Sequence, residues 1–285
     1  MPKTIGNPLT WAFGALGSTA EYAASVADAV AADASAPPQI RKLSYDDLKT
    51  ALKKGFDDMS VFRSDVIFVC LLYPLMGMVL VALALQGDYV QLLFPVLSGF
   101  ALTGPVAAVG LYEMSRRREK GVPVNWLALM DVLRSPKFGG VVILALFHVV
   151  IFIIWVMAAD LIYTLTVGPS DAPQTMMAFA QTVLTTPAGW AMIVIGLAVG
   201  FVFALVVLAI SVVSFPLLLD RDVGLVMAVT TSVRVARANP QVIAAWGAIV
   251  AGSLALGSIP ALLGLVIVMP VLGHATWHLY RRAVV

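Results

Sequence analysis

The run VVILALFHVVIFIIWVMAADL, residues 141–161, is the strongest structural signal in this 285-residue chain. It holds fourteen Leu, Ile, Phe and Val residues and one charged residue, Asp160, near its end. Each of the fourteen favours insertion at the centre of a membrane helix by roughly 0.3–0.6 kcal/mol, and one Asp near an end costs less than their sum. The run therefore predicts a transmembrane helix.

Four other stretches lack Asp, Glu, Lys and Arg altogether: 66–85, 89–112, 189–219 and 241–280. About 20 apolar residues in a helix cross the ~30 Å hydrocarbon core of a bilayer. Charged residues make up 12% of the chain and hydrophobic residues 60%, whereas soluble domains carry about 25% charged residues. The composition indicates an all-α, polytopic bundle of transmembrane helices.

The apolar stretches predict about six spans within a transmembrane domain at residues 65–285. The last uncharged run, 241–280, is too long for one crossing, and Gly257 to Pro260 supply a break. The expected spans are 65–86, 89–113, 138–163, 188–216, 241–257 and 260–280.

The basic residues predict the topology. All 18 Lys and Arg residues fall in the N-terminal region before the first span, the 114–137 and 217–240 loops, or the C-terminal end. Lys and Arg translocate poorly, so loops that carry them stay in the cytoplasm. We expect a multi-pass protein of the cell inner membrane, surrounded by lipid, with cytoplasmic N- and C-termini.

Two segments precede the first span. Residues 1–38 predict a flexible or weakly helical cytoplasmic tail, and a helix that lies on the membrane or docks a partner is the alternative. Residues 39–64 predict an interfacial amphipathic helix, with Ser44 as its N-cap. Its apolar face is expected to consist of Leu48, Leu52, Phe56 and Met59.

The spans also suggest an internal repeat. Three times, an amphipathic or polar helix (43–62, 126–133 and 225–238) leads into a pair of spans. All three units would share one orientation, which is typical of a parallel repeat. Chance patterning of hairpins that start and end in the cytoplasm is the alternative.

His148 and Asp160 are the polar residues of interest inside the third span. Ionisable residues in membranes are costly and usually face a bundle interior or a water-filled path. The two are twelve positions apart, about 18 Å along a helix, so they cannot touch within it. For His148, a neutral ring bonded to a neighbouring helix and a role as proton relay or ligand both remain open.

His274 and His278 share one face of the last span, at i and i+4. Such spacing can place two nitrogens on one metal, but a metal site needs further ligands, and the sequence offers none nearby. With Trp277 and Tyr280 alongside, the pattern favours an interfacial belt. We expect no catalytic, cofactor or metal site.

Arg116, Arg117, Arg118 and Lys120 form the densest basic cluster. The cluster enforces topology and can attract anionic lipid headgroups by about 1 kcal/mol per charge. It is short and adjoins a span, so nucleic acid is not an expected partner. In the fourth span, a GxxxG pattern at 196–200 indicates a close helix contact within the bundle or between subunits.

Four motifs resemble a family of uncharacterised bacterial integral membrane proteins, defined as a domain of unknown function. They are KTIGNPLTW (3–11), IRKLSYDDLKTALKKGFDDM (40–59), TGP with GLYEMSRR (103–117) and GHATWHLYRR (273–282). The resemblance covers roughly residues 38–285 and implies a multi-pass inner-membrane protein without assigned functional residues. Some members carry names that suggest a cytochrome c oxidase subunit. This chain has three His in total, and a haem–copper centre needs several.

Three classes of function remain open. The first is a non-catalytic accessory, scaffold or assembly component of a membrane complex, such as a respiratory one. The expected protein partners are a larger membrane complex or further copies of the chain in a homo-oligomer. The second is a transporter or channel for a small apolar or weakly polar solute, suggested by the proline-containing spans and His148. The third, least favoured, is a membrane enzyme, because no nucleophile–base pair or carboxylate dyad is visible.

Overall fold

The computed structural model describes residues 37–61, 63–86, 89–124, 138–168 and 175–285. These residues are helical, with one isolated β-bridge between Ile40 and Val284. The predicted tail at 1–38, apart from its last two residues, and the predicted helix at 126–133 lie outside the described residues. The all-helical class is confirmed.

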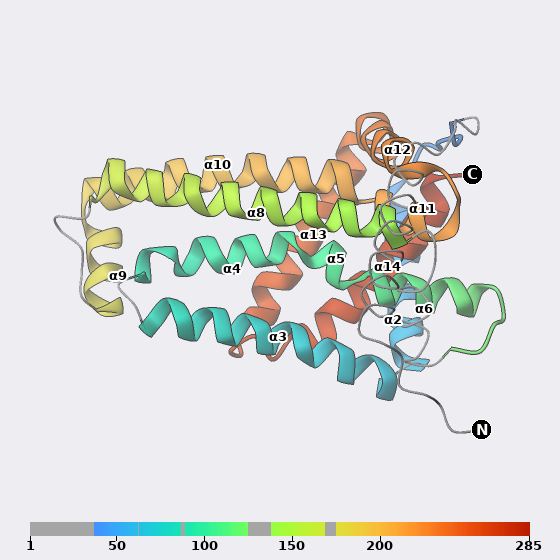
Figure 1. Ribbon diagram of the computed structural model, residues 1–285, viewed down its shortest axis with the longest axis horizontal. Helices are drawn as coiled ribbons and strands as arrows, with labels where there is room; N and C mark the ends of the chain where they lie inside the picture. The colour runs from blue at the N-terminus through green and yellow to red at the C-terminus, as the bar shows by residue number, and fades with distance from the viewer. Residues whose placement is uncertain (1–36, 62, 87–88, 125–137, 169–174) are drawn as a thin grey trace, which may run out of the picture.

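Four helical segments run along the long axis of the molecule in Figure 1. The longest has 29 residues, about 44 Å at 1.5 Å per residue. The helix Pro187–Ser211 has Thr186 as its N-cap, because the Thr186 hydroxyl accepts a hydrogen bond from the Gly189 amide at 3.0 Å. The four segments are α3 (Arg63–Gln86), α4 (Leu93–Leu102), α8 (Phe138–Thr166) and α10 (Pro187–Ser211).

The second predicted span is interrupted. A short 3-10 turn, η1 (Val90–Leu92), precedes α4, and the helix then breaks at Thr103 and again at Ala108. Pro105 has no amide proton, and its ring collides with the carbonyl four residues earlier, which favours a break in the helix there. The chain continues as α5 (Gly104–Ala107) and α6 (Val109–Glu119).

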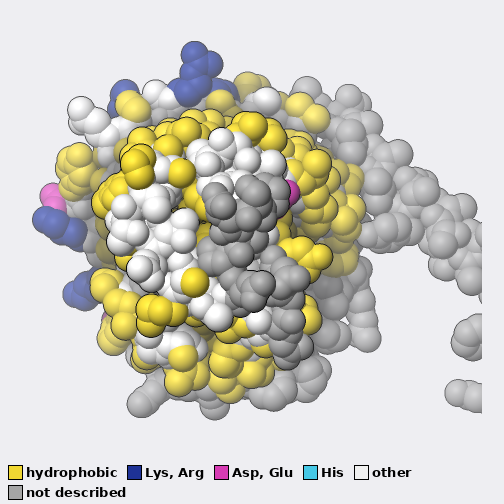
Figure 2. Space-filling view, turned by 90° about the vertical axis from the view of Figure 1, so that its left-hand side faces the viewer, with side chains coloured by type: hydrophobic (Ala, Val, Ile, Leu, Met, Phe, Trp, Pro, Cys, Tyr) yellow, Lys and Arg dark blue, Asp and Glu magenta, His cyan; other side chains and the backbone are white. Residues whose placement is uncertain are grey.

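The two ends of the molecule differ in charge. One end carries α9 (Met176–Thr185), which lies across the long helices, and the other carries α2 (Tyr45–Val61), α11 (Ser214–Asp220) and α12 (Gly224–Ala238). Figure 2 looks onto the α9 end and shows hydrophobic and uncharged side chains, with Lys and Arg atoms around the rim. We call the opposite end, formed by α2, α6, α11, α12 and the C-terminus, the charged end.

Helices α13 (Pro240–Ser258) and α14 (Leu265–Ala283) form a hairpin that starts and ends at the charged end. The chain termini of the described region meet there, since the Arg41 amide donates to the Ala283 carbonyl at 2.9 Å. The main hydrophobic core lies at the same end, where the largest buried side chains are Tyr112, Phe215, Trp246, Trp277 and Tyr280.

Among the described residues, three helices are long and apolar enough to cross a membrane. They are α8, the segment Pro187–Asp220 that joins α10 to α11, and α13; shorter apolar helices cover Leu71–Leu85, Val90–Leu102 and Met176–Thr185. Six crossings and the threefold repeat therefore stay predictions.

The face of α2 that packs against the rest of the protein consists of small and polar residues. Leu48 is buried, Phe56 is 58% exposed, and Ala51 and Gly55 take the inner positions beside Asp58. Small side chains let α2 approach α14 closely, which bulky residues such as Phe56 would prevent. Contact of the apolar face with the membrane interface stays a prediction.

Candidate functional site

The closest helix contact at the charged end joins α2 to α14. A Cβ atom added to Gly55 would lie 2.6 Å from both the Ala275 amide nitrogen and the Val271 carbonyl oxygen. The backbones of the two helices therefore touch without side chains between them. One turn further along α2, on the same face, is Asp58.

Asp58 is a buried acid, 4% exposed, at the junction of three helices. Its Oδ2 atom accepts a hydrogen bond from the Ser115 hydroxyl of α6 at 2.6 Å and contacts Nε2 of His278 of α14 at 2.9 Å. Its Oδ1 atom accepts a hydrogen bond from the Arg118 guanidinium. One carboxylate thus connects α2, α6 and α14.

His274 extends this arrangement. Its Nδ1 atom lies 2.8 Å from the Ser115 hydroxyl oxygen, and its side chain is fully buried. Because the single hydroxyl proton of Ser115 points to Asp58, we assign the proton of this contact to Nδ1 of His274. We name Asp58, Ser115, Arg118, His274 and His278 the Asp58 cluster.

The Asp58 cluster is not arranged as a hydrolytic triad. In such a triad the hydroxyl hands its proton to a histidine that a carboxylate orients, whereas Ser115 donates to the carboxylate of Asp58 directly. Ser115 is also 1% exposed, so a substrate carbonyl could not reach it. The arrangement holds helices together and keeps Asp58 ionised.

The environment of Asp58 lowers the pKa of its carboxyl below the usual value of 3.8. Burial opposes ionisation, but the hydrogen bonds from His278 and Ser115 and the nearby charges outweigh it. Asp47 at the start of α2 behaves alike: burial raises its pKa, and bonds from Ser44 and Arg282 bring it below 3.8.

A second group of polar contacts joins α14 to α6 and α11. The Tyr280 hydroxyl donates to Asp220 at 2.8 Å, and the Trp277 indole donates to Glu119 at 3.0 Å. Arg281 contacts both acids, Glu119 at 3.1 Å and Asp220 at 3.4 Å. The two aromatic side chains of α14 therefore serve as hydrogen-bond donors to half-buried Asp220 and exposed Glu119.

A third group fixes the segment before α2. Asp47 accepts from the Ser44 amide at 2.8 Å and pairs with Arg41 and Arg282. Asn239, at the end of α12, accepts from the Leu43 amide at 2.7 Å. The start of α2 is thus attached to α12 and to the end of α14.

The basic cluster predicted to face lipid is engaged with acids of the same chain. The Glu113 carboxylate forms salt bridges with the guanidinium groups of Arg116, at 2.7 Å, and Arg117, at 2.8 Å. Arg118 belongs to the Asp58 cluster, and Lys120 is 3.5 Å from Asp220 with a side chain 51% exposed. Contact with lipid headgroups stays a prediction for these four residues.

The structure places His148 and Asp160 in different surroundings. His148 is 1% exposed, with Nδ1 2.8 Å from the Leu144 carbonyl oxygen and its ring against Phe215. Among the described residues, its Nε2 atom has no hydrogen-bond partner. Asp160 is exposed, near the α9 end of α8. The two residues do not form one site.

The predicted belt residues lie among protein side chains. His274 and Trp277 are 0% and 1% exposed, while His278 borders Asp58. Their level relative to the bilayer surface stays a prediction. No group of three His, Cys, Asp or Glu side chains among the described residues is arranged to hold a metal ion.

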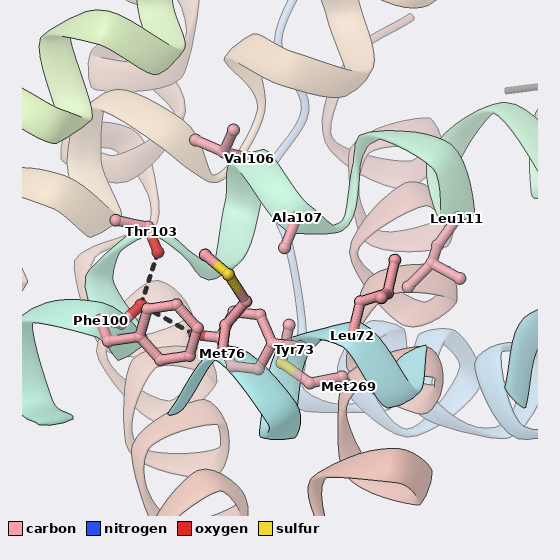
Figure 3. Close-up of a pocket in the computed structure, with 9 residues that line it drawn as sticks. All are labelled: Leu72, Tyr73, Met76, Phe100, Thr103, Val106, Ala107, Leu111 and Met269. Carbon is pink, nitrogen blue, oxygen red and sulfur yellow. Dashed lines mark hydrogen bonds between the residues drawn. The ribbon is translucent and has the colours of Figure 1, made fainter. Parts of the chain in front are cut away.

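A pocket of about 350 Å³ lies between α3, the broken second span and α14 (Figure 3). Its two hydroxyl groups are already satisfied, because Tyr73 and Thr103 both donate to the Phe100 carbonyl, at 2.8 and 2.7 Å. Only apolar molecules would match such a surface. Its other lining residues are Leu72, Met76, Val106, Ala107, Leu111 and Met269.

The acidic partners in these contacts were not anticipated from the sequence. Asp58 lies outside the predicted apolar face of its helix, and no local pattern singles out Ser115 or Glu119. One signal was available: Ala51, Gly55 and Asp58 recur at helical spacing. The quoted motifs 40–59, 103–117 and 273–282 also contain most residues of the Asp58 cluster.

Comparison with known proteins supports the membrane assignment. Residues 93–220 match the family model described as "Predicted integral membrane protein (DUF2189)". No curated protein and no solved structure matches the chain. The matched range includes α8 and α10, so the resemblance to an integral membrane protein family of unknown function is confirmed there. The chain is an integral membrane protein with apolar helices.

Proposed function

We propose that this protein is a non-catalytic accessory, scaffold or assembly component of a larger complex in the cell inner membrane. The observation that carries the proposal is the use of its buried acids. Asp47, Asp58 and Glu113 are each paired with basic residues of the same chain. A catalytic site requires polar groups that face a substrate, whereas Asp47 and Asp58 connect helices and Glu113 pairs with arginines of its own helix α6.

The proposed orientation places the charged end in the cytoplasm, together with both termini. The support is the confinement of all 18 Lys and Arg residues to segments that precede the first span or follow even-numbered crossings. Helix α2 would then lie along the inner surface, with its exposed Tyr45 and Phe56 available to lipid.

Helix α10 offers the surface that best suits a partner. Of the residues in the most apolar stretch of Pro187–Asp220, only 6% are buried in the protein. A Cβ atom added to Gly200 would lie 2.9 Å from the Trp155 ring. A Cβ atom added to Gly196 would have no atom of the described residues within 4 Å. Small residues on an exposed membrane helix allow another helix to approach closely. The GxxxG pattern thus has one internal and one open glycine.

The experiment is purification of the tagged full-length protein from native membranes, followed by mass spectrometry. We expect stoichiometric recovery of a larger membrane complex. The variant Gly196→Leu should reduce that recovery at least tenfold, because leucine would obstruct the open position. Gly252→Leu is the matched control, since nothing lies within 4 Å of a Cβ at this α13 glycine either.

Two results would oppose the proposal. Recovery of the protein alone would remove its basis, and recovery only as a homo-oligomer would shift weight to transport. An equal loss with Gly196→Leu and Gly252→Leu would show that the α10 surface is not the contact.

Transport of a small apolar or weakly polar solute is the second candidate, favoured by His148. A buried imidazole nitrogen without a partner among the described residues is unusual and could bind a proton or solute. The variant His148→Phe should abolish function if the ring is a relay. Full rescue of a deletion phenotype by His148→Phe would exclude the relay.

A further inference from the structure

The turn between α13 and α14 lies halfway along the neighbouring helix α3. A Cβ atom at Gly77 would be 2.8 Å from a methyl carbon of Leu262 in that turn. Gly77 is fourteen residues from the first residue of α3 and nine from the last, about 21 and 14 Å along the axis. The tip of the hairpin therefore stops well before the α9 end.

A small apolar cluster fixes this position. Leu262 and Leu265 are buried with Tyr73 of α3 and Met269 of α14, and Phe100 of α4 packs against them. In Figure 1 the turn likewise lies partway along α3 and α4. This cluster thus attaches the tip to the middle of α3 and to α4.

The part of α14 between the turn and the Asp58 cluster leads to the same depth. His274, which contacts Ser115 of that cluster, lies nine positions after Leu265. They span about 14 Å along a helix, while a crossing requires about 30 Å. Beyond His274, α14 is paired with Asp58 of α2, an element of the charged end.

The turn can exist inside hydrocarbon because its backbone is internally bonded. Non-helical backbone at membrane depth needs its donors satisfied. The amides of Ala261, Leu262 and Leu263 donate to Ile259, Ser258 and Pro260, at 2.9, 3.1 and 3.0 Å. The Ser258 hydroxyl donates to Leu254 at 2.8 Å, and residues 259–273 are all apolar or Gly.

The outer side of the hairpin is suited to lipid. Leu256, Ile259, Leu263 and Ile267 are 69%, 77%, 58% and 57% exposed. Ala261 and Leu262 adopt positive φ angles of 50° and 67°, a costly conformation for non-glycine residues. The strain permits a reversal in which Leu262 points inward to the cluster.

We propose that α13 and α14 form a re-entrant hairpin that enters the membrane from the charged end, turns at mid-depth and returns to the same side. The crossings are then α3, the α4–α6 segment, α8 and α10, in place of six. The number of crossings stays even, so the C-terminus remains beside α2. The inference needs a bilayer around the helices but not the proposed function or a particular orientation.

Depth can be measured with a nitroxide spin label in the full-length protein in liposomes. Cys70→Ala removes the native thiol, and Ile259→Cys places a label at the tip. Ile153→Cys, 52% exposed near the centre of α8, is the mid-depth reference. Asp171→Cys, in the loop between the third and fourth predicted spans, and Val285→Cys are the references for the two sides of the membrane that the topology predicts.

We expect the label at 259 to match the label at 153, with frequent collisions with oxygen and at least fivefold fewer with a water-soluble nickel complex than at 171. Accessibility to nickel at 259 equal to that at 171 would overturn the re-entrant hairpin. Leu263→Cys repeats the measurement if Ile259→Cys does not fold. An inverted orientation would exchange the sides of 171 and 285 and leave the depth at 259 unchanged.

Discussion

Asp58 shows how one buried charge can organise a membrane-protein end. Its carboxylate is in hydrogen-bond contact with Ser115 and Arg118 of α6 and with His278 of α14. Breaking a buried ion pair by removing one partner is strongly destabilising, because the remaining charge is buried without compensation. The stability of the charged end should therefore depend on Asp58 more than on other acids of α2.

Asp58→Asn tests this dependence. The amide keeps the size of the side chain but removes the charge that Arg118 and His278 contact, so we expect a loss of about 3 kcal/mol. The matched control is Asp57→Asn, whose parent residue is exposed and should be near neutral. Thermal unfolding of both variants in the same detergent checks the difference, and equal melting temperatures would contradict the role of Asp58.

The pH dependence of stability follows from the same carboxyls. The pKa values of Asp58 and Asp47 lie below 3.8 in the folded chain, so the unfolded chain binds protons first as the pH falls. Their contribution is present above the unfolded value of about 3.8 and is lost as the pH falls through the folded values.

We therefore expect the melting temperature to hold between about pH 7 and 5 and to fall below about pH 4. Asp58→Asn should show a shallower acid decline, since it has one low-pKa carboxyl fewer, while Asp57→Asn should follow the parent protein. An unchanged acid slope in Asp58→Asn would argue against the paired carboxylate.

Individual pairings were largely beyond prediction from the sequence. The i, i+4 spacing of His274 and His278 was visible, but their partners were not: His278 contacts Asp58, 220 residues away, and His274 contacts Ser115. The burial of Asp58 depends on Gly55 bringing two helices together, a tertiary effect that local pattern does not encode. The basic run 116–118 likewise predicted topology but not the pairing of Arg116 and Arg117 with Glu113.

Helix α2 owes its position to small residues. The contact at Gly55 leaves no room for a side chain, because the nearest atoms belong to the backbone of α14. Hydrophobic periodicity predicted a helix here with an apolar face toward the membrane, but it did not predict which residues pack against α14. Periodicity counts apolar residues, whereas close packing selects for small ones.

Gly55→Ala should separate α2 from α14. Overpacking of this kind costs about 1–3 kcal/mol, so unfolding should occur at a lower temperature and proteolysis at residues 37–61 should accelerate. Gly252→Ala, with open space around its Cβ position, should be neutral or more stable by up to about 1 kcal/mol. Equal stability of both variants would contradict the close helix contact.

The long apolar helices were the most predictable elements. Helix α8 spans Phe138–Thr166 against a prediction of 138–163, and α10 begins within a residue of the prediction. The second span was predicted at 89–113 with its prolines as kinks, and in the structure the helix breaks at Thr103 and Ala108, on either side of Pro105. Apolar runs fix where a helix can form, but the depth reached by α13 and α14 depends on packing against Gly77.

At the scale of the whole molecule, hydropathy and charge predicted an all-helical membrane protein with one charged end. Lipid as solvent explains why residues such as Ile259 and Leu256 remain exposed. The architecture of the charged end, in which four acids link α2, α6, α11 and α14, emerged only from the structure. It is this end that the proposed function assigns to the cytoplasm.

The most direct test is a reporter that is active on one side of the membrane only. Alkaline phosphatase inserted after Asp171 in the full-length chain should be active, because the loop between the third and fourth predicted spans is expected to face away from the cytoplasm. The same enzyme fused after Val285 should be inactive. Activity at Val285 with none at Asp171 would reverse the orientation. Equal activity at both positions, or extraction of the protein without detergent, would contradict a membrane-embedded molecule with one cytoplasmic charged end.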